Sequence, residues 1–402
     1  MKRLYTVTLA CLTSSIAFSQ QDSVSLDPGY QSEVWYSLSN GEVSSNNVSI
    51  WDLGFDVSPT GYAIRINAGS GIRAWAYPGD TSDFETLDTT GISGWTELTN
   101  GEISWYEGAL NSLENGLDVG WGEYDMSTHV ITGNRIFVLE FGNGSYQKLI
   151  INSLTSGSFY FHHASLDNSM DMSHVLTKSD FTNVDFGYFS LINHSSVQVE
   201  PQSDWDLYFG KYTADLGMPY NVTGVLLQPD AQAVKAYPVN DPNTYTNWGS
   251  WGFSSDMNTI GYDWKSYNFS QGGYDIADST VYFVKTANED IYKVVFTGFG
   301  GSSTGKMYFN KSLVSTIGLN EESSSFIEVY PNPASDIITI VSDYNENATA
   351  QLLSTNGSIV RTTSLKSSLS TQSIDVSALP RGIYILRVQS GSDVQTERII
   401  IQ

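Results

Sequence analysis

The sequence predicts an all-β protein built from several domains, and three observations carry this expectation. Its 402 residues include 10 Trp, 24 Tyr, 18 Phe and 35 Gly, and strands favour aromatic residues whereas turns favour glycine. Residues 62–67 alternate with a period of two, as a half-buried strand does. No apolar stripe with the 3.6-residue period of an α-helix continues beyond two turns.

Paired strands are predicted where two short apolar runs flank a turn. Residues 136–141 and 148–151 are such runs, and Gly142-Asn143-Gly144 follows the first of them. Residues 281–284 and 292–296 repeat the pattern further along the chain. Apolar runs around a Gly/Asn turn are typical of β-hairpins, so we expect a hairpin at each place.

The charge balance limits the classes of partner. The chain carries 43 Asp and Glu against 19 Lys and Arg, a formal net charge of −24. Nucleic acids and anionic membrane surfaces are bound by clustered Lys and Arg, so the composition argues against both. No later stretch reaches the run of about 18 apolar residues that a transmembrane helix needs, and we expect no transmembrane segment.

Residues 1–19 are predicted to be a secretory signal peptide, cleaved before Gln20. Lys2 and Arg3 give a positive start, an apolar run follows, and small residues precede the cleavage point. The single cysteine, Cys11, lies inside this segment. We therefore expect a secreted mature chain with neither a disulfide nor a catalytic thiol.

A repeat of about 150 residues runs through most of the chain. A repeat of this length is a whole domain, so we expect two homologous domains, residues 20–175 and residues 176–317. The recurring anchors are Trp51, Asp52 and Leu53 with Trp205, Asp206 and Leu207; Ala76, Tyr77 and Pro78 with Ala236, Tyr237 and Pro238; Trp121 with Trp264; Lys148 with Lys293; and Tyr160 and Phe161 with Tyr308 and Phe309.

The C-terminal part of the chain differs in composition and predicts a third domain. Residues 318–325 are mostly polar and predict a linker. Residues 326–402 hold 5 Lys and Arg against 7 Asp and Glu, and Asn356-Gly357 suits a tight turn between strands. The apolar strands of this segment predict a small Ig-like β-sandwich.

Five runs of this third domain form an ordered pattern: residues 329–334, 337–341, 352–357, 379–388 and 397–402. With this pattern the segment resembles the type A sorting domain of cargo of the type IX secretion system of Bacteroidetes. The resemblance implies a partnership with the type IX secretion machinery, export across the outer membrane and removal of this domain. The mature protein is then expected in the medium or on the outer cell surface. The residues that carry the sorting motif are Tyr330, Pro331, Asn332, Pro333, Gly382 and Tyr384.

The first copy of the repeat carries aromatic and strand positions at residues 35–43, 51–55, 64–71, 121–124 and 146–149. The second copy keeps part of them, at Tyr188 to Leu191, Trp205 to Phe209 and Tyr292 to Val294. In these positions each copy looks like the HmuY family of haem-binding proteins of Bacteroidetes. The resemblance implies an all-β fold in which two side chains from loops hold the haem iron.

The same resemblance points to specific ligands. It places one axial ligand five positions after a strand tryptophan, which is Met126 in the first copy and Phe269 in the second. A thioether can ligate haem iron, whereas a phenyl ring cannot. His129 lies three residues after Met126, so this pair is the predicted haem site. Residues 95–118, where the resemblance places the second ligand, contain neither His nor Met.

Tryptophans in predicted loops add candidates and an alternative. Trp95 and Trp105 fall outside the repeated anchors, and an exposed indole can stack on a porphyrin or on a sugar ring, although packing beneath long loops is the simpler explanation. The leading hypothesis is a non-catalytic, exported haem-binding protein. The alternative is a surface adhesion module that binds a glycan or a protein without haem.

The sequence contains no recognisable catalytic or metal-binding constellation. His162 and His163 are adjacent on a predicted strand and point to opposite faces, so they cannot easily share one ion. Residues 301–305 fit the Gly-x-Ser-x-Gly pattern but lie between two strands instead of at a strand-to-helix elbow. Asp52 and Asp206 are expected to be structural hydrogen-bond acceptors. We therefore expect no enzyme and no metal site.

Overall fold

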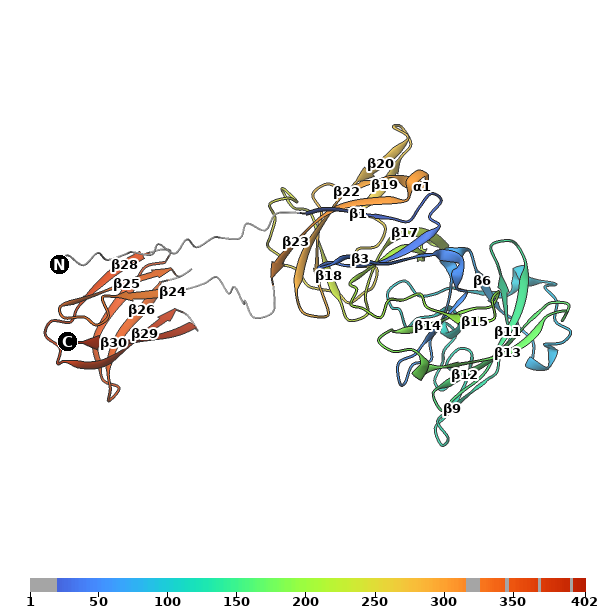
Figure 1. Ribbon diagram of the computed structural model, residues 1–402, viewed down its shortest axis with the longest axis horizontal. Coiled ribbons are helices and arrows are strands. Elements are labelled where there is room, and N and C mark those ends of the chain that lie inside the picture. The colour runs from blue at the N-terminus through green and yellow to red at the C-terminus, as the bar shows by residue number, and fades with distance from the viewer. Residues whose placement is uncertain (1–19, 316–325, 344–346, 368–369, 391–392) are drawn as a thin grey trace, which may run out of the picture. The chain divides into compact units, whose positions relative to one another are not determined.

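The computed structural model describes residues 20–315, 326–343, 347–367, 370–390 and 393–402. Contacts divide the chain into two units, residues 1–317 and residues 318–402. The predicted signal peptide with Cys11 and the predicted linker lie outside the described residues. Within the described part the protein is all-β, as expected, with short 3₁₀ helices and a single four-residue α-helix (Figure 1).

The first unit contains two lobes. The first lobe is residues 48–200, and the second lobe is residues 20–47 together with residues 201–315. Each lobe has one larger sheet and one four-stranded sheet. The short helices are η1 (Val48–Ile50), η2 (Ala68–Ser70), η3 (Thr81–Asp83), η4 (Ile92–Gly94), η5 (Ala109–Asn111), η6 (Lys178–Asp180) and α1 (Gly301–Thr304).

The larger sheet of the first lobe has the order β13-β12-β11-β10-β6-β7, and the hairpin β8–β9 pairs with β11. The smaller sheet has the order β15-β14-β4-β5. The strand bounds are β4 (Leu53–Asp56), β5 (Ile64–Ile66), β6 (Arg73–Ala76), β7 (Thr96–Leu98), β8 (Gly122–Asp125), β9 (Val130–Gly133), β10 (Phe137–Glu140), β11 (Tyr146–Thr155), β12 (Ser158–Ser165), β13 (Asp171–Thr177), β14 (Phe186–Ser190) and β15 (Ser195–Val197).

The second lobe repeats this plan. Its larger sheet has the order β1-β23-β22-β21-β18, its smaller sheet has the order β3-β2-β16-β17, and β19 pairs with β20 in a hairpin. The strand bounds are β1 (Gln20–Ser25), β2 (Ser32–Ser37), β3 (Gly41–Asn47), β16 (Leu207–Asp215), β17 (Pro219–Leu227), β18 (Gln232–Ala236), β19 (Lys265–Asn268), β20 (Gly273–Ile276), β21 (Val281–Lys285), β22 (Ile291–Phe299) and β23 (Lys306–Ser315).

The two predicted copies exchange strands. Strands β1 and β2, from the start of the first copy, pair with β23 and β16 of the second, and in Figure 1 the blue β1 lies beside the orange β23. In return, β14 of the second copy pairs with β4 of the first, and β13, which spans the predicted boundary, pairs with β12. The sheets therefore do not follow the predicted division near residue 175, because each lobe is completed by strands of the other copy.

Asp52 and Asp206 anchor the exchanged strands, which bears out their expected structural role. Asp52 Oδ2 accepts a hydrogen bond from the N–H of Leu191, which directly follows β14, at 2.7 Å. Asp206 Oδ2 accepts one from the N–H of Leu38, directly after β2, also at 2.7 Å. Asp52 is buried, and Asp206 is partly buried. The recurring Trp-Asp-Leu motif thus marks the two equivalent points where one copy holds a strand of the other.

Each lobe has its own core, and a third cluster joins the lobes. Alternating side chains of the smaller sheets point to opposite faces: Leu207 and Phe209 pack into the core of the second lobe, whereas Tyr208 and Tyr212 pack into the seam between the lobes. The two smaller sheets therefore meet at the seam, and the larger sheets lie outside them. The seam cluster is Trp35, Trp51, Phe186, Tyr188, Val199, Trp205, Tyr208, Tyr212, Ala214, Val222, Leu226 and Met257.

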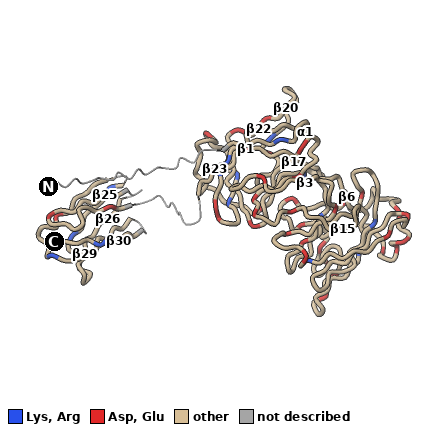
Figure 2. The backbone as a smooth tube through the Cα atoms, in the orientation of Figure 1, with Lys and Arg blue, Asp and Glu red and all other residues tan. Residues whose placement is uncertain are grey.

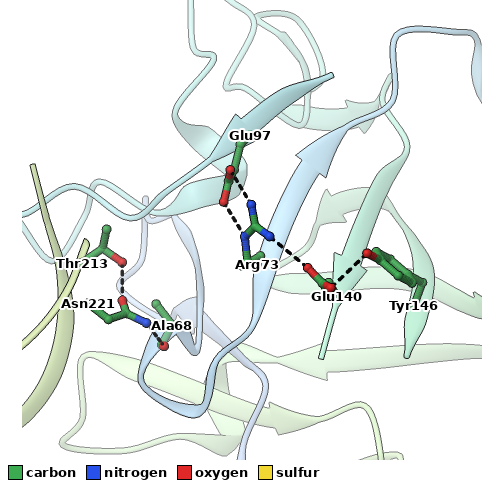
Figure 3. A network of polar contacts seen from close by, with 7 residues as sticks. All are labelled: Ala68, Arg73, Glu97, Glu140, Tyr146, Thr213 and Asn221. Atoms are coloured by element: carbon green, nitrogen blue, oxygen red, sulfur yellow. Dashed lines mark hydrogen bonds and ion pairs between the residues drawn. The ribbon is translucent and has the colours of Figure 1, made fainter. Parts of the chain in front are cut away.

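Polar contacts also cross between the lobes. Figure 3 shows Asn221 of β17 donating to the carbonyl oxygen of Ala68 at 2.8 Å. In the same view Arg73 of the first lobe forms ion pairs with Glu97 at 2.8 Å and with Glu140 at 3.2 Å. Acidic residues are spread over the whole first unit (Figure 2), so no single segment carries the negative charge.

The second unit is a two-sheet sandwich around an aliphatic core. One sheet has the order β24-β25-β28 and the other β27-β26-β29-β30, and Ile338 and Ile340 of the first sheet pack with Leu352 and Leu386 of the second. No helix in the described part of the chain is long and apolar enough to span a membrane. The strand bounds are β24 (Phe326–Tyr330), β25 (Ile337–Asp343), β26 (Ala348–Ser354), β27 (Ile359–Leu365), β28 (Ser370–Asp375), β29 (Gly382–Ser390) and β30 (Asp393–Ile401).

Candidate functional site

The first lobe contains a cleft of about 510 Å³, within the size range of small-molecule sites. The hairpin β8–β9, the turn between β11 and β12 and two loops surround it. Most of its larger side chains are apolar or aromatic, while His129, Lys178 and several hydroxyl groups add polarity. Its lining residues are Pro59, Thr60, Gly61, Tyr62, Gly116, Leu117, Val119, Tyr124, His129, Ile131, Leu154, Thr155, Ser156, Gly157 and Lys178.

His129 stands at the open side of this cleft, held by the local turn. The turn between β8 and β9 is fixed by Asp125, whose carboxylate accepts hydrogen bonds from the N–H and the hydroxyl of Ser127. These bonds hold the pKa of Asp125 at about 2. His129 then adopts a left-handed backbone with φ of 57°. Its Nδ1 lies 2.6 Å from the Tyr124 hydroxyl, which leaves Nε2 for a ligand.

Lys178 supplies a positive charge to the cleft. Its ammonium donates to the carbonyl oxygens of Ser58 at 2.7 Å and of Gly61 at 2.6 Å, and it lies 5.5 Å from the centre of the Phe159 ring. Burial lowers the pKa of Lys178. The two carbonyl groups compensate for the lost hydration of the ammonium, so the cleft combines apolar walls with one fixed cation.

The structure brings one of the four predicted ligand-binding residues, His129, to this cleft. Met126 is 70% exposed and is not part of the lining. Trp95 packs edge-on against Tyr77, with ring centres 5.2 Å apart. Trp105 packs against the seam cluster, and its indole N–H donates to the carbonyl oxygen of Leu227 at 2.6 Å. The predicted Met126–His129 pair is therefore not joined in one pocket, because the hairpin turn projects Met126 outwards.

The equivalent hairpin of the second lobe carries an exposed aromatic group. Phe269, the counterpart of Met126, is 90% exposed. Its ring centre lies 5.0 Å from that of Tyr267, which lies 5.1 Å from that of Tyr274. The hairpins thus present an apolar side chain at each tip, a thioether in one lobe and a phenyl ring in the other.

A cluster of three histidines in the first lobe was not foreseen from the sequence. His163 lies on β12, His174 on β13 and His194 in the turn between β14 and β15. One ring nitrogen of each lies within 4.8 Å of the others, and the ring centres are 4.9 to 6.0 Å apart. We call these three residues the histidine cluster. The pairing of β13 with β12 and of β14 with β4 creates it.

Burial governs the protonation of this cluster. Burial, together with the neighbouring imidazoles of His174 and His194, lowers the pKa of His163 to about 4. Burial also lowers the pKa of His174. His162 lies on the opposite face of β12, where it contacts Asp171 and the Phe84 ring. The predicted alternation of His162 and His163 is thus present, with His163 alone of the two in the cluster.

In the second unit, the predicted sorting residues hold the final strand. The amide of Asn332 donates to the carbonyl oxygen of Arg398 at 2.7 Å and accepts from the N–H of Ile400 at 2.9 Å. Tyr384 is buried, and its hydroxyl donates to the carbonyl oxygen of Pro380 at 2.8 Å. Tyr330 ends β24, Pro331 and Pro333 flank Asn332, and Gly382 begins β29.

Comparison with family models gives a match over these residues. Residues 328–402 match the model described as the secretion system C-terminal sorting domain. The tail is a type IX sorting domain. The protein is therefore exported by the type IX secretion system and is secreted or held at the cell surface. The matched residues are 75 of the 402 in the chain. The match therefore identifies the export pathway of the protein and does not extend to the two lobes of the first unit.

The other comparisons are less informative. The sequence has no significant match among curated proteins. Among solved structures, dimeric latent PorU from Porphyromonas gingivalis is similar over 92% of this chain and 40% of its own length, with 9% identity and a TM-score of 0.19. The chain thus spans less than half of the length of PorU. The resemblance of the two copies to the HmuY family remains a prediction.

Proposed function

We propose that the exported protein is a non-catalytic binding protein and that the cleft of the first lobe is its binding site. The ligand class that suits this cleft is a small, flat and mainly apolar molecule with an acidic group. Haem is the first candidate, because it combines a flat apolar ring, two carboxylates and an iron that an imidazole can ligate.

The observation that carries this proposal is the imidazole of His129 in the lining of an apolar cleft. Tyr62, Leu117 and Ile131 supply apolar contact area on the walls. If the Nδ1–H of His129 donates to the Tyr124 oxygen, Nε2 carries the free lone pair that iron requires. Lys178 supplies a cation that suits a carboxylate.

The proposed haem would have a single protein ligand. Met126 is exposed and lies outside the lining, and the remaining lining residues contain no second thioether or imidazole. We therefore expect a five-coordinate haem, or one completed by water, in place of the two-ligand site that the family resemblance implies.

A haemin titration of the exported chain tests this proposal. We expect a shifted Soret band that saturates at one equivalent in the wild type and in Met126→Ala, and that is lost in His129→Ala. His174→Ala serves as the matched control, because it removes a histidine of the same lobe outside the cleft. A Soret shift that survives His129→Ala, or a titration without any shift at micromolar haemin, would reject the cleft as a haem site.

A second candidate function rests on the exposed aromatic hairpin of the second lobe. Phe269 and Tyr267 present adjacent rings to solvent, and such rings stack on the apolar face of a sugar. A surface adhesion module for glycans would use this hairpin. Binding to a glycan array that Phe269→Ala abolishes and His129→Ala leaves intact would favour adhesion, and an array without signal would leave the cleft as the binding site.

A further inference from the structure

We propose that the histidine cluster, His163, His174 and His194, binds a divalent transition-metal ion, with Zn²⁺ as the first candidate. Three imidazoles that leave one coordination position open form a common donor set for zinc, and imidazole also suits copper and nickel. The proposed site lies in the first lobe, is independent of the cleft, and involves neither His129 nor haem.

Three buried ring nitrogens of the histidine cluster lack hydrogen-bond partners. His163 Nε2, His174 Nε2 and His194 Nδ1 are buried and have no partner within the described part of the chain. Buried polar atoms in proteins are nearly always hydrogen-bonded. Three such atoms on neighbouring rings call for one partner that all of them share, and a metal ion meets this need.

A hydrogen bond on the outer side of the His163 ring fixes the position of its proton. Its Nδ1 lies 2.8 Å from the amide oxygen of Gln147 on the neighbouring strand β11. An amide oxygen can only accept, so Nδ1 carries the proton and Nε2 carries a free lone pair. A hydrogen bond from the outer nitrogen is the usual way in which proteins orient a metal-binding imidazole.

The equivalent positions of the second lobe serve as an internal control for the histidine cluster. Tyr160 and Phe161 align with Tyr308 and Phe309, so His163 corresponds to Lys311. Phe161 pairs with His174 as Phe309 pairs with Asp22, so His174 corresponds to Asp22. Lys311 and Asp22 form an ion pair at 3.5 Å. At these two positions the second lobe therefore pairs its side chains with each other, whereas the first lobe has imidazoles at both.

The hydroxyl group that completes the network of the second lobe is also absent from the first. The Tyr36 hydroxyl donates to Asp22, and Tyr36 corresponds to Phe189. The Phe189 ring packs against His174, with ring centres 4.9 Å apart. Nothing in this position can thus satisfy the His174 nitrogen, which is left for an ion.

The backbone of His194 lies in the left-handed region. This residue has φ of 55°, whereas its counterpart in the second lobe is Gly41, with φ of 91°. The left-handed region suits glycine and is strained for other residues. A histidine that replaces a glycine here places its ring beside His163 and His174, and strained residues cluster at functional sites.

Only small side-chain movements are needed to bring the three ring nitrogens to zinc-binding distances. Zinc–nitrogen bonds of about 2.0–2.1 Å place tetrahedral ligand atoms roughly 3.3 Å apart, and the ring nitrogens already lie within 4.8 Å of one another. His194 sits in a turn and is partly exposed, so its ring can rotate inwards. A water molecule can fill the fourth position.

Calorimetric titration of the exported chain with Zn²⁺ tests the proposal, with Co²⁺ absorption as a second reading of the ligand set. We expect one ion per chain, and a loss in affinity of more than about tenfold in His194→Gly, because a direct ligand contributes more than the outer partners whose loss costs about 10- to 100-fold. His194→Gly installs the residue of the second lobe and relieves the backbone, so its fold should be retained.

Two further variants keep the test decisive. The variant His163→Lys with His174→Asp installs the ion pair of the second lobe, and we expect it to fold and to bind no zinc. His162→Ala removes the adjacent histidine outside the cluster, and we expect wild-type affinity. Failure of the wild type to bind zinc at micromolar concentration, equal binding by His194→Gly, or loss of binding in His162→Ala would each overturn the proposal.

Discussion

The carboxylate of Asp52 accepts a hydrogen bond from the backbone N–H of Leu191, 139 residues further along the chain. An equivalent hydrogen bond joins the carboxylate of Asp206 to the backbone N–H of Leu38, which lies 168 residues earlier in the chain. Each of these bonds lies within one lobe, where it secures a strand that the other copy supplies. The lobes also share the seam cluster, so the first unit should unfold as one cooperative body, although it contains two cores.

Replacing Asp52 by Ala should destabilise the first unit by about 1–3 kcal/mol, because it leaves the buried N–H of Leu191 without its partner. Asp206→Ala should have a similar effect, since its bond to Leu38 has the same length. Denaturant unfolding measures both, and the exposed Asp256→Ala is the matched control. Equal stability of Asp52→Ala and Asp256→Ala would contradict the proposed anchoring role.

Glu33 predicts a pH dependence of stability. Its buried carboxyl accepts hydrogen bonds from the Trp51 indole at 2.8 Å and the Tyr208 hydroxyl at 2.9 Å, one residue from each lobe. Burial raises the pKa of Glu33 from 4.5 to about 8. The contribution to stability is thus fully present below pH 4.5 and is lost as the pH rises through 8, with a slope of at most about 1.4 kcal/mol per pH unit.

The variant Glu33→Gln should flatten this decline. Denaturant unfolding at pH 5, 5.5 and 6 measures the slope, in a range below the pKa of about 7 to which burial lowers Lys265. The exposed Glu123→Gln should keep the wild-type slope. Glu200, whose pKa burial raises to about 8, contributes a decline of its own, so Glu33→Gln should reduce the slope without abolishing it. An unchanged slope in Glu33→Gln would show that this carboxyl ionises freely in the folded protein.

In the sorting domain, Asn332→Ala should weaken the attachment of the last strand. The amide of Asn332 makes two hydrogen bonds to β30, and their loss should cost about 1–3 kcal/mol in the stability of this domain. We expect less protein in the medium and more in the periplasm of a host with a type IX system. Asn356→Asp, in a turn that tolerates either residue, is the control, and equal export of both variants would show that Asn332 plays no part.

The sorting domain was predictable from the sequence, whereas the pairing of strands between the two predicted copies was not. Aromatic and lysine anchors such as Trp121 and Lys148 recur because they are buried at equivalent places, and this recurrence is visible in the sequence. Two copies of one sequence pattern, however, offer equivalent strand edges. No local pattern therefore tells whether β14 pairs with a strand of its own copy or with β4 of the other. The predicted boundary at residue 175 followed the sequence copies for this reason.

The dependence on strand pairing also explains why the histidine cluster was not predicted from the sequence. His163 and His174 come together through the pairing of β12 with β13, and His194 through that of β14 with β4. None of these contacts can be derived from residue spacing. Met126 was selected through its place in a resemblance, and only the hairpin geometry shows that it projects away from the cleft while His129 remains in the lining.

Nitrogen-15 NMR of the histidine side chains tests the central claim most directly, because the chain has five histidines and the two proposed sites use different ones. Haemin should perturb the resonances of His129 alone, Zn²⁺ should perturb those of His163, His174 and His194, and His162 should respond to neither. Haemin that leaves His129 unchanged, or that instead perturbs the histidine cluster, would contradict the assignment of the cleft as the binding site.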